Sequence, residues 1–272
     1  MLIRNSLTRW VLWILFAAVV LALLVSPLVM TLVLALAGEW TDVMPSGVTL
    51  SHLGEALSGD SLASFWVSIQ TAIIASLSAV VLGTWGALAA DAAPAWWAKP
   101  LSVLFHLPAA LPSVVIGLGT LIAFSRPPLA LNGTAAIVVI VQCLMVLSFT
   151  FSTVKGAMAG LDPQQRLVAS ALGASPARIL WAITLPRLMP AIGAAAGLSV
   201  ALCMGELGAT VMVYPASWRT IPVSIFTAID RGDLFLGSAM TALLVLVTVL
   251  ILGLIGRIRW GTSGRASARR PR

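Results

Sequence analysis

The sequence predicts an all-α polytopic membrane protein with six transmembrane helices, and three observations indicate this fold class. Hydrophobic residues make up 60% of the 272 residues and charged residues only 9%, whereas a soluble domain carries about 25% charged residues. Apolar runs of about 20 residues, the length that crosses a bilayer, recur along the chain. The lysines and arginines lie between these runs and at the C-terminus. Because lipid offers the backbone no hydrogen bonds, the apolar runs are expected to be helices.

Six runs are long and apolar enough to cross a membrane, namely residues 10–37, 64–90, 101–124, 134–154, 191–213 and 236–256. The first run has an alternative interpretation as a cleaved signal peptide, because Arg4 and Arg9 precede it and residues 35–39 resemble a signal-peptidase site. A signal peptide has an apolar core of about 7–15 residues, and this longer run favours a retained span. The predicted organisation is an N-terminal segment 1–9, a six-span domain 10–256 and a tail 257–272.

The positive charges predict the orientation of the chain. All but three of the 16 Lys and Arg residues lie at the N-terminus, in the second or fourth loop, or in the tail. Positive residues are retained on the cytoplasmic side, so both termini and the loop 155–190 are predicted to be cytoplasmic, and the acidic loop 38–63 external. This distribution accounts for the net charge of +7 without a nucleic-acid partner. The basic tail is expected to be attracted to anionic lipid headgroups of the bilayer.

The cytoplasmic loop 155–190 contains two predicted short amphipathic helices. Two helix-start pairs flank one turn glycine: Asp162 with Pro163, Ser175 with Pro176, and Gly173 between them. Pro186 is expected to end the second helix before the fifth span. Apolar faces in water need a cover, either the ends of neighbouring spans or a separate protein, and a simple interfacial re-entry helix is the alternative. The tight turn favours a rigid docking element.

This loop resembles the cytoplasmic loop of permease subunits in type I ABC importers. The family signature places E-A-A before a glycine and I-x-L-P further on. LGAS at 172–175 and ITLP at 183–186 match, whereas Leu-Val-Ala at 167–169 replaces E-A-A, so that only Ala169 agrees. The resemblance implies a type I importer permease fold and a coupling helix that docks on an ATPase subunit. The implied contact residues are Val168, Ala169, Ala171, Leu172, Gly173, Ala174, Ser175, Pro176 and Arg178.

Three further segments resemble the branch of this family that transports iron, sulfate, molybdate, thiamine or phosphonates: residues 107–119, 205–215 and 220–226. The resemblance covers about residues 64–254 and implies a multi-pass permease of the bacterial cytoplasmic (inner) membrane. It also implies a second permease subunit, identical or paralogous, and an extracytoplasmic solute-binding protein. Residues 214–233 resemble most the 2-aminoethylphosphonate type. Molybdate or sulfate, thiamine and ferric iron are the alternative substrates.

The chain lacks the motifs of an energy-converting or catalytic subunit. A P-loop requires G-x-x-x-x-G-K-[ST], and neither lysine, Lys99 or Lys155, stands in that pattern. ATP and Mg are therefore expected on a partner ATPase subunit, with no cofactor bound by this chain. No C-x-x-C or H-E-x-x-H spacing predicts a metal site, and Cys143 and Cys203 are interpreted as buried apolar residues.

Two functions of another class are alternatives, a membrane enzyme and an ion-coupled secondary transporter. A membrane enzyme would need paired ionisable groups at depth, but the spans contain one carboxylate and one histidine. An ion-coupled secondary transporter remains as the alternative, although it would favour more intramembrane ionisable groups and internal repeats.

Five residues are candidates for the translocation path or its gate: Glu206, Gly205, Gly208, His106 and Ser113. The Glu206 carboxylate either lines the path or is a structural hydrogen-bond partner. His106 precedes two prolines that open the helix backbone, so it lies either in a bent helix or near solute. In the external segment 214–226, Trp218 and Arg219 either anchor a gate helix or mark the membrane surface.

Overall fold

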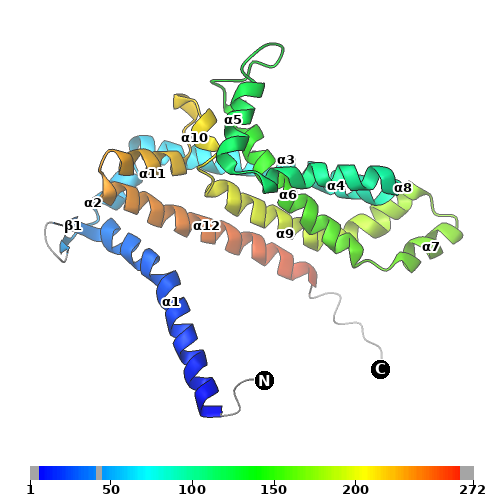
Figure 1. The fold of residues 1–272 in the computed structure, drawn as a ribbon, viewed down its shortest axis with the longest axis horizontal. Coiled ribbons are helices and arrows are strands. Elements are labelled where there is room, and N and C mark those ends of the chain that lie inside the picture. The colour runs from blue at the N-terminus through cyan, green and yellow to red at the C-terminus, as the bar shows by residue number, and fades with distance from the viewer. Residues whose placement is uncertain (1–5, 41–44, 264–272) are drawn as a thin grey trace. The chain divides into compact units, whose positions relative to one another are not determined.

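A computed structural model describes residues 6–40 and 45–263, with side chains for 9–40 and 45–257. Residues 1–5 of the predicted N-terminal segment 1–9, and residues 264–272 of the predicted tail 257–272, lie outside the described residues. The chain divides into two compact units, which are described separately (Figure 1). Unit 1 comprises Met1–Ala63 and Ser224–Leu246, and unit 2 comprises Ser64–Val223 and Val247–Arg272.

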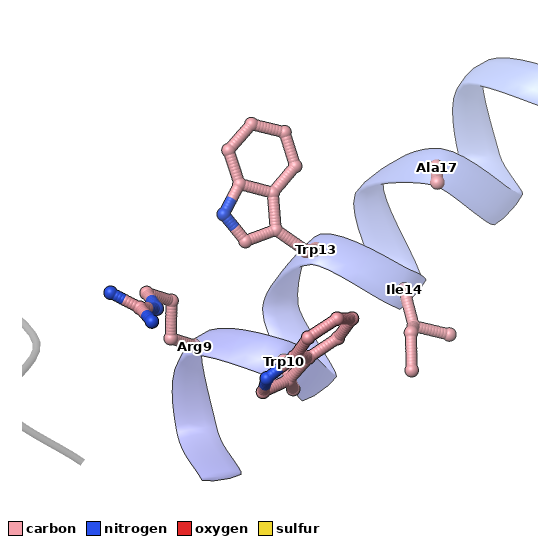
Figure 2. A pocket seen from close by; sticks show the side chains of 5 residues that line it. All are labelled: Arg9, Trp10, Trp13, Ile14 and Ala17. Atoms are coloured by element: carbon pink, nitrogen blue, oxygen red, sulfur yellow. The ribbon is translucent and has the colours of Figure 1, made fainter. Parts of the chain in front are cut away.

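Unit 1 begins with α1 (Ser6–Leu36), an apolar helix whose side chains are almost all exposed. At its start Arg9, Trp10, Trp13, Ile14 and Ala17 line a shallow hollow, and Figure 2 shows the two indole rings beside Arg9. Tryptophan and basic residues favour the membrane–water interface, so this hollow suits headgroups. The hairpin of β1 (Ala37–Glu39) and β2 (Ser46–Val48) pairs Ala37 with Val48, and α2 (Ser51–Ala56) follows.

The remainder of unit 1 comes from helices that also run through unit 2. These are α3 (Gly59–Ala92), α11 (Ile221–Asp230) and α12 (Leu234–Ser263). Within unit 1 the His52 ring stacks on Phe235, with centroids 5.2 Å apart, which fixes α2 on the first turn of α12. A Cβ added to Gly237 would lie 2.8 Å from Ile229 Cγ1, so α12 can approach α11 closely only with a glycine at this position.

Unit 2 is a helical bundle organised around α6 (Ala135–Ala159), which contacts α4 (Ala95–Ala110), α5 (Ser113–Ala123) and α9 (Leu185–Met204). The chain leaves α6 through α7 (Pro163–Ala171), α8 (Pro176–Ile179) and the π-helical turn η1 (Leu180–Thr184). After α9 come the short helix α10 (Thr210–Val213) and the 3-10 turn η2 (Ala216–Trp218).

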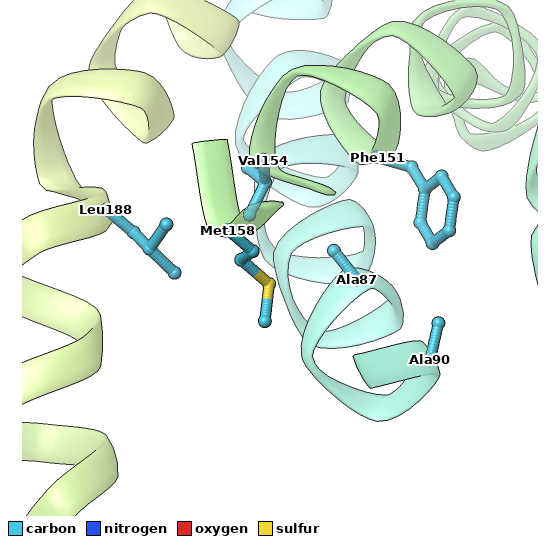
Figure 3. Packing of buried hydrophobic residues seen from close by; sticks show 6 residues of the cluster. All are labelled: Ala87, Ala90, Phe151, Val154, Met158 and Leu188. Atoms are coloured by element: carbon cyan, nitrogen blue, oxygen red, sulfur yellow. The ribbon is translucent and has the colours of Figure 1, made fainter. Parts of the chain in front are cut away.

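Small residues let the helices of unit 2 pack closely. Ala87 and Ala90 of α3 meet Phe151, Val154 and Met158 of α6, together with Leu188 of α9, in one buried cluster (Figure 3). Lipid tails are as apolar as these side chains, so close van der Waals packing, rather than removal from water, holds such a cluster together. The cluster joins α3, α6 and α9 at the end of the bundle that leads into α7.

Five helices in the described residues are long and apolar enough to cross a membrane, or six if one bent pair is a single span. The predicted spans 10–37, 64–90, 134–154 and 236–256 correspond to α1, α3, α6 and α12, each somewhat longer than predicted. These four predictions are confirmed as helices of membrane-spanning length and apolarity.

The predicted third span 101–124 is wrong as one continuous helix. It consists of α4 and α5, which meet at an angle of 109°. Leu111, between them, has an extended backbone (φ −104°, ψ 143°). The following residue, Pro112, disfavours the helical conformation at Leu111 and has no N–H to continue the ladder. The proline that was expected to open the backbone therefore breaks the helix.

A fifth span is present, but its predicted bounds 191–213 and the predicted stop at Pro186 are wrong. The chain is helical without interruption over Pro176–Met204 and then leaves the helix at Gly205. Leu185 N–H donates to the Leu180 carbonyl, one residue further back than in an α-helix. This π-helical turn accommodates the missing N–H and the ring of Pro186 without a break.

Candidate functional site

The segment α7–Gly173–α8 is fixed by its own caps. The Asp162 carboxylate accepts from Gln164 N–H at 2.9 Å, and the Ser175 hydroxyl accepts from Arg178 N–H at 3.3 Å. Gly173 has a φ of +83°, as its position at the predicted turn requires. Around it Gly173 N–H donates to the Ser170 carbonyl and Ala174 N–H to the Ala169 carbonyl, the two bonds of a Schellman motif. The two predicted helix starts and the left-handed turn are confirmed.

The apolar face of α7 is not covered by its own chain. Leu167, Val168 and Leu172 expose 68%, 58% and 83% of their surface. Most of the other predicted coupling residues are exposed as well, and Ala169 and Ala174 are half-buried. Of the two covers expected from the sequence, the neighbouring spans do not reach these three side chains. The surface is therefore open to another molecule.

An ion pair ties α7 to the end of α3. Arg166 Nη1 lies 2.8 Å from Asp91 Oδ2, and the two side chains are 36% and 41% exposed. A cavity of ≈ 520 Å³ lies beside this pair, between α3 and the α7–α8 turn, and is also lined by Trp85, Ser170 and Thr184. This tether is not evident from the sequence. The only signal was that opposite charges stand in two segments that were both assigned to the cytoplasmic side.

The second half of the segment α7–Gly173–α8 continues into the membrane span that contains α9. Because α8, η1 and α9 form one helical run over Pro176–Met204, the residues after Gly173 move with α9. Leu188, four residues into α9, is fully buried in the cluster with α3 and α6. A displacement at the Gly173 turn would therefore be transmitted directly to the packed spans.

The candidate path residue Glu206 lies in the connector between α9 and α10. Its carboxylate accepts from Ala209 N–H and Thr210 N–H, both at 2.9 Å, and from the Thr210 hydroxyl at 2.7 Å. The two amides are unsatisfied donors at the start of α10, so the Glu206 side chain caps this short helix. Gln142 of α6 in turn donates to the Thr210 hydroxyl at 3.1 Å.

The structure brings three of the other candidates to this connector. A Cβ on Gly208 would collide with the hydroxyl of Ser113, the first residue of α5. One turn further along α5, a Cβ on Gly117 would lie 2.6 Å from the Ala209 carbonyl oxygen. Gly205 forms the end of α9. Glu206, Gly205, Gly208 and Ser113 thus belong to one region, in which α5 packs on the connector through glycine contacts.

The fifth candidate, His106, lies on α4, the other helix of the bent pair, and contacts α6 instead. Its Nδ1 is 2.6 Å from the Ser102 carbonyl and its Nε2 is 3.0 Å from the Ser152 hydroxyl. The Ser152 hydroxyl could not be identified as a partner from the sequence, because it stands 46 residues from His106.

The segment expected to carry a gate helix is attached to α3. Trp218 Nε1 donates to the Thr71 hydroxyl at 2.9 Å, and Ile221 N–H, at the start of α11, donates to the Ser68 hydroxyl at 2.7 Å. Trp218 is half-buried. Of the two interpretations of Trp218, anchoring of the helix that follows agrees better with these bonds than a mere surface marker.

Metal-ligating groups do not gather in the residues that the structure describes: no three His, Cys, Asp or Glu side chains lie close enough to hold an ion. Cys143 and Cys203 are free and buried, as interpreted from the sequence.

Comparisons with known proteins agree with this arrangement. Residues 79–259 match the family described as "Binding-protein-dependent transport system inner membrane component". The chain is 44% identical over 232 residues to a candidate 2-aminoethylphosphonate transport system permease protein, PhnV, of Salmonella paratyphi A, which covers 85% of this chain and 88% of that protein. It is 31% identical to the molybdenum transport system permease protein ModB of Mycobacterium tuberculosis over 73% of this chain and 80% of that protein.

Two solved structures share the fold. A chain of a bacterial alginate ABC transporter in complex with its pentasaccharide-bound periplasmic protein superposes with a TM-score of 0.74, at 14% identity, over 92% of this chain and 94% of that chain. A chain of the methionine ABC transporter MetNI superposes with a TM-score of 0.64, at 16% identity, over 76% and 96%. The fold class expected from the cytoplasmic loop, that of type I importer permeases, is confirmed.

Proposed function

The chain belongs to the family of binding-protein-dependent transport system inner membrane components, and on that premise we propose that it forms one half of the solute path of an ATP-driven ABC importer. It is a multi-pass membrane permease, proposed to reside in the bacterial cytoplasmic membrane. A second permease subunit, identical or paralogous, would complete the path. An extracytoplasmic solute-binding protein would deliver the solute, and two ABC ATPase subunits would hold ATP and Mg.

The exposed apolar face of α7 carries this proposal. Leu167, Val168 and Leu172 are held rigidly by a capped turn, yet they are open to solvent at the end of the bundle that is predicted to be cytoplasmic. Isolated apolar side chains on a surface need no explanation, but three on one face of a short rigid helix form a docking patch. Its proposed occupant is a groove on the ATPase subunit, as in the importers that the loop resembles.

Coupling would follow from two mechanical links. ATP binding closes the ATPase subunits and moves the docked α7. The Asp91–Arg166 pair passes this motion to α3, and the run from Pro176 to Met204 passes it to α9. Because α3, α6 and α9 share one packed cluster, they would move together. The path then opens outward, and hydrolysis resets it.

We assign the docking contact to the nine residues expected from the sequence, Val168 to Arg178 without Ser170 and Ala177. Leu167 stands where the family signature has an acidic residue, and it extends the apolar patch by one side chain. The acidic contact of the family would thus be replaced here by an apolar one.

We propose that the connector between α9 and α10 forms part of the gate. It contains Glu206, Gly205 and Gly208 and packs on Ser113. Its backbone is non-helical between α9 and α10, and it packs on α5 through two glycine contacts. Non-helical backbone at membrane depth is tolerated only where it is buried in protein or lines a water-filled cavity. The capping role of Glu206 and a gate role are compatible, because a capped connector can move as a unit.

The proposed substrate is an organophosphonate such as 2-aminoethylphosphonate. The 44% identity to a candidate permease for that compound extends over most of both chains, whereas the molybdenum permease is 31% identical. Molybdate or sulfate, thiamine and ferric iron are the competing substrates. Titration calorimetry of the co-encoded solute-binding protein with each of these compounds tests the assignment, and binding of 2-aminoethylphosphonate alone is the expected result.

The docking role is tested at Gly173. Its φ of +83° lies far from the −65° that a proline ring imposes, so Gly173→Pro must distort the turn. We expect the variant to lose co-purification with the ATPase subunit and ATP-driven transport. Gly156→Ala is the matched control, because Gly156 lies in α6 near the same end with open space around it. Retention of the ATPase subunit by both variants would refute the docking assignment.

A further inference from the structure

A cluster of one lysine, one histidine and two serine side chains lies where α4 contacts α6. Ser102 and His106 come from α4, and Ser152 and Lys155 come from α6. His106, Ser152 and Lys155 are exposed in the single chain and Ser102 is half-buried. These four residues are called the α4–α6 cluster below.

Hydrogen bonds connect the members of the cluster. Lys155 Nζ donates to the Ser102 hydroxyl, and that hydroxyl donates to the Ala98 carbonyl at 2.7 Å. His106 Nδ1 must carry a hydrogen, because its partner, the Ser102 carbonyl, can only accept. Ser152 lies 3.0 Å from His106 Nε2 and 2.7 Å from the Ser148 carbonyl. Its single hydrogen serves one of these two acceptors, so the Ser152 hydroxyl has no hydrogen left for a ligand.

Phe151 of α6 contacts both the His106 ring and the Lys155 ammonium. The His106 ring meets the Phe151 ring edge-on at 5.3 Å, and Lys155 Nζ lies 5.3 Å from the centroid of the same ring. The Phe105 ring stacks on the Phe151 ring, with centroids 4.7 Å apart. Phe151 itself is fully buried. An ammonium near an aromatic ring is attracted by the ring face, which holds Lys155 over the bundle.

The cluster has no counter-ion in the unit that contains it. No carboxylate of the described residues of unit 2 pairs with Lys155 or His106. Exposed ionisable groups on membrane helices almost always face a water-filled cavity or a partner rather than lipid tails. Lys155 has three donors and uses one of them on Ser102, so two remain for an acceptor. A site whose free donors are the N–H groups of an ammonium, with no acid paired to it, favours an oxyanion over a cation.

We propose that the α4–α6 cluster binds the phosphorus oxyanion of the solute on the cytoplasmic half of the path, with Lys155 as its charged contact. The inference rests on the proposed function and names residues that this function alone does not assign. A tetrahedral PO₃ group offers several acceptor oxygens that can take the two free Lys155 donors. The same chemistry would suit a lipid headgroup phosphate, which is the other source that an experiment must separate.

Protection of an engineered thiol tests the site directly. In the full importer complex Ser152→Cys introduces a thiol at a position that is exposed in the single chain. Both native cysteines of this chain are buried and should not be labelled. Labelling by a methanethiosulfonate reagent is measured in zwitterionic nanodiscs. We expect 2-aminoethylphosphonate and inorganic phosphate, at millimolar concentration, to slow labelling several-fold, and ethanolamine, which lacks the oxyanion, to leave it unchanged. Unchanged labelling with the oxyanions, or protection that requires phosphatidylglycerol in the disc, would overturn the proposal.

Transport separates this proposal from the proposed function. In proteoliposomes Lys155→Met is expected to lower 2-aminoethylphosphonate uptake about tenfold, while binding-protein-stimulated ATP hydrolysis persists and Lys155→Arg restores most of the uptake. Arg178→Met, which removes a positive charge from the docking element, is the contrasting variant and should lower both activities. If the unmodified complex imports no phosphonate, the proposed substrate fails. If it imports phosphonate and Lys155→Met imports it equally well, the α4–α6 site fails.

Discussion

Asp91 and Arg166 form an ion pair at 2.8 Å between the end of α3 and the first helix of the docking element. The two residues are 75 positions apart in the sequence, and their contact links the segment that would touch the ATPase to a span that does not adjoin it along the chain. Both side chains are more than a third exposed. Such pairs contribute only about 0.2–1 kcal/mol to stability, so a mechanical role is the more informative one to test.

Breaking the pair is expected to uncouple rather than unfold the permease. Asp91→Asn should lower the ratio of solute imported to ATP hydrolysed about two- to fivefold, with a melting temperature close to that of the parent, because the pair is solvent-screened. The measurement is uptake and ATP hydrolysis in the same proteoliposomes.

The exchanged pair, Asp91→Arg with Arg166→Asp, serves as the control and should recover the ratio. A ratio that is unaffected by Asp91→Asn would show that α3 receives the motion by another route.

Leu172 is expected to be the main apolar contact of the docking element. It is the most exposed side chain of the patch, at 83%, and Leu172→Glu would place a charge at the centre of an apolar interface. The affinity for the ATPase subunit should fall about tenfold or more, which corresponds to about 1.4 kcal/mol. Co-purification and titration in nanodiscs measure this loss.

Gln164→Glu adds the same charge on α7, near the Asp162 cap rather than on the apolar patch, and should bind the ATPase subunit normally. Equal loss in both variants would indicate a general charge effect instead of a defined patch.

Glu206→Gln distinguishes a cap from a solute contact. The carboxylate accepts three hydrogen bonds, and bonds to charged groups contribute about 1.5–3 kcal/mol each at most. An amide can replace only one of the two oxygens as an acceptor, so the melting temperature of the permease should fall by several degrees.

The exposed Glu55→Gln, which removes a carboxylate from α2, should leave the melting temperature unchanged. An unchanged melting temperature with abolished transport in Glu206→Gln would instead favour a direct role of Glu206 in the path.

Gly117 and Gly119 form a matched pair on α5. A Cβ at position 117 would lie 2.6 Å from the Ala209 carbonyl, whereas position 119 has nothing within 4 Å. Gly117→Ala should therefore push α5 away from the connector and lower both thermal stability and transport. Gly119→Ala should be neutral or slightly stabilising, since alanine favours helix over glycine by about 1 kcal/mol. Similar behaviour of the two variants would refute the close packing of α5 on the connector.

The features that could be predicted from the sequence are those that depend on a few adjacent residues. The side chains of Asp162 and Ser175 accept from amides two or three positions away, and Gly173 permits the left-handed turn between them. These residue types therefore specify the two helix starts and the turn. The apolar length of α3 and α6 is similarly a property of one segment, because any backbone crossing lipid must bond internally.

The features that could not be predicted depend on the rest of the fold. Pro186 was expected to end a helix, but a single π-helical turn before it keeps the run intact. Pro112 does break its helix: Leu111 before it has an extended backbone, whereas Leu185 before Pro186 is helical. The contact of Asp91 with Arg166, and that of His106 with Ser152, required the arrangement of α3, α4, α6 and α7 in space.

The central claim is that ATP hydrolysis on a partner drives import of a phosphonate through this permease. The most direct measurement is uptake of labelled 2-aminoethylphosphonate into proteoliposomes that contain the permease, its ATPase and its solute-binding protein, with ATP enclosed or supplied on the ATPase side. The account predicts uptake that requires ATP and the binding protein and is unaffected when ion gradients are collapsed. Uptake that persists without ATP while an ion gradient is maintained would contradict it and would identify an ion-coupled transporter.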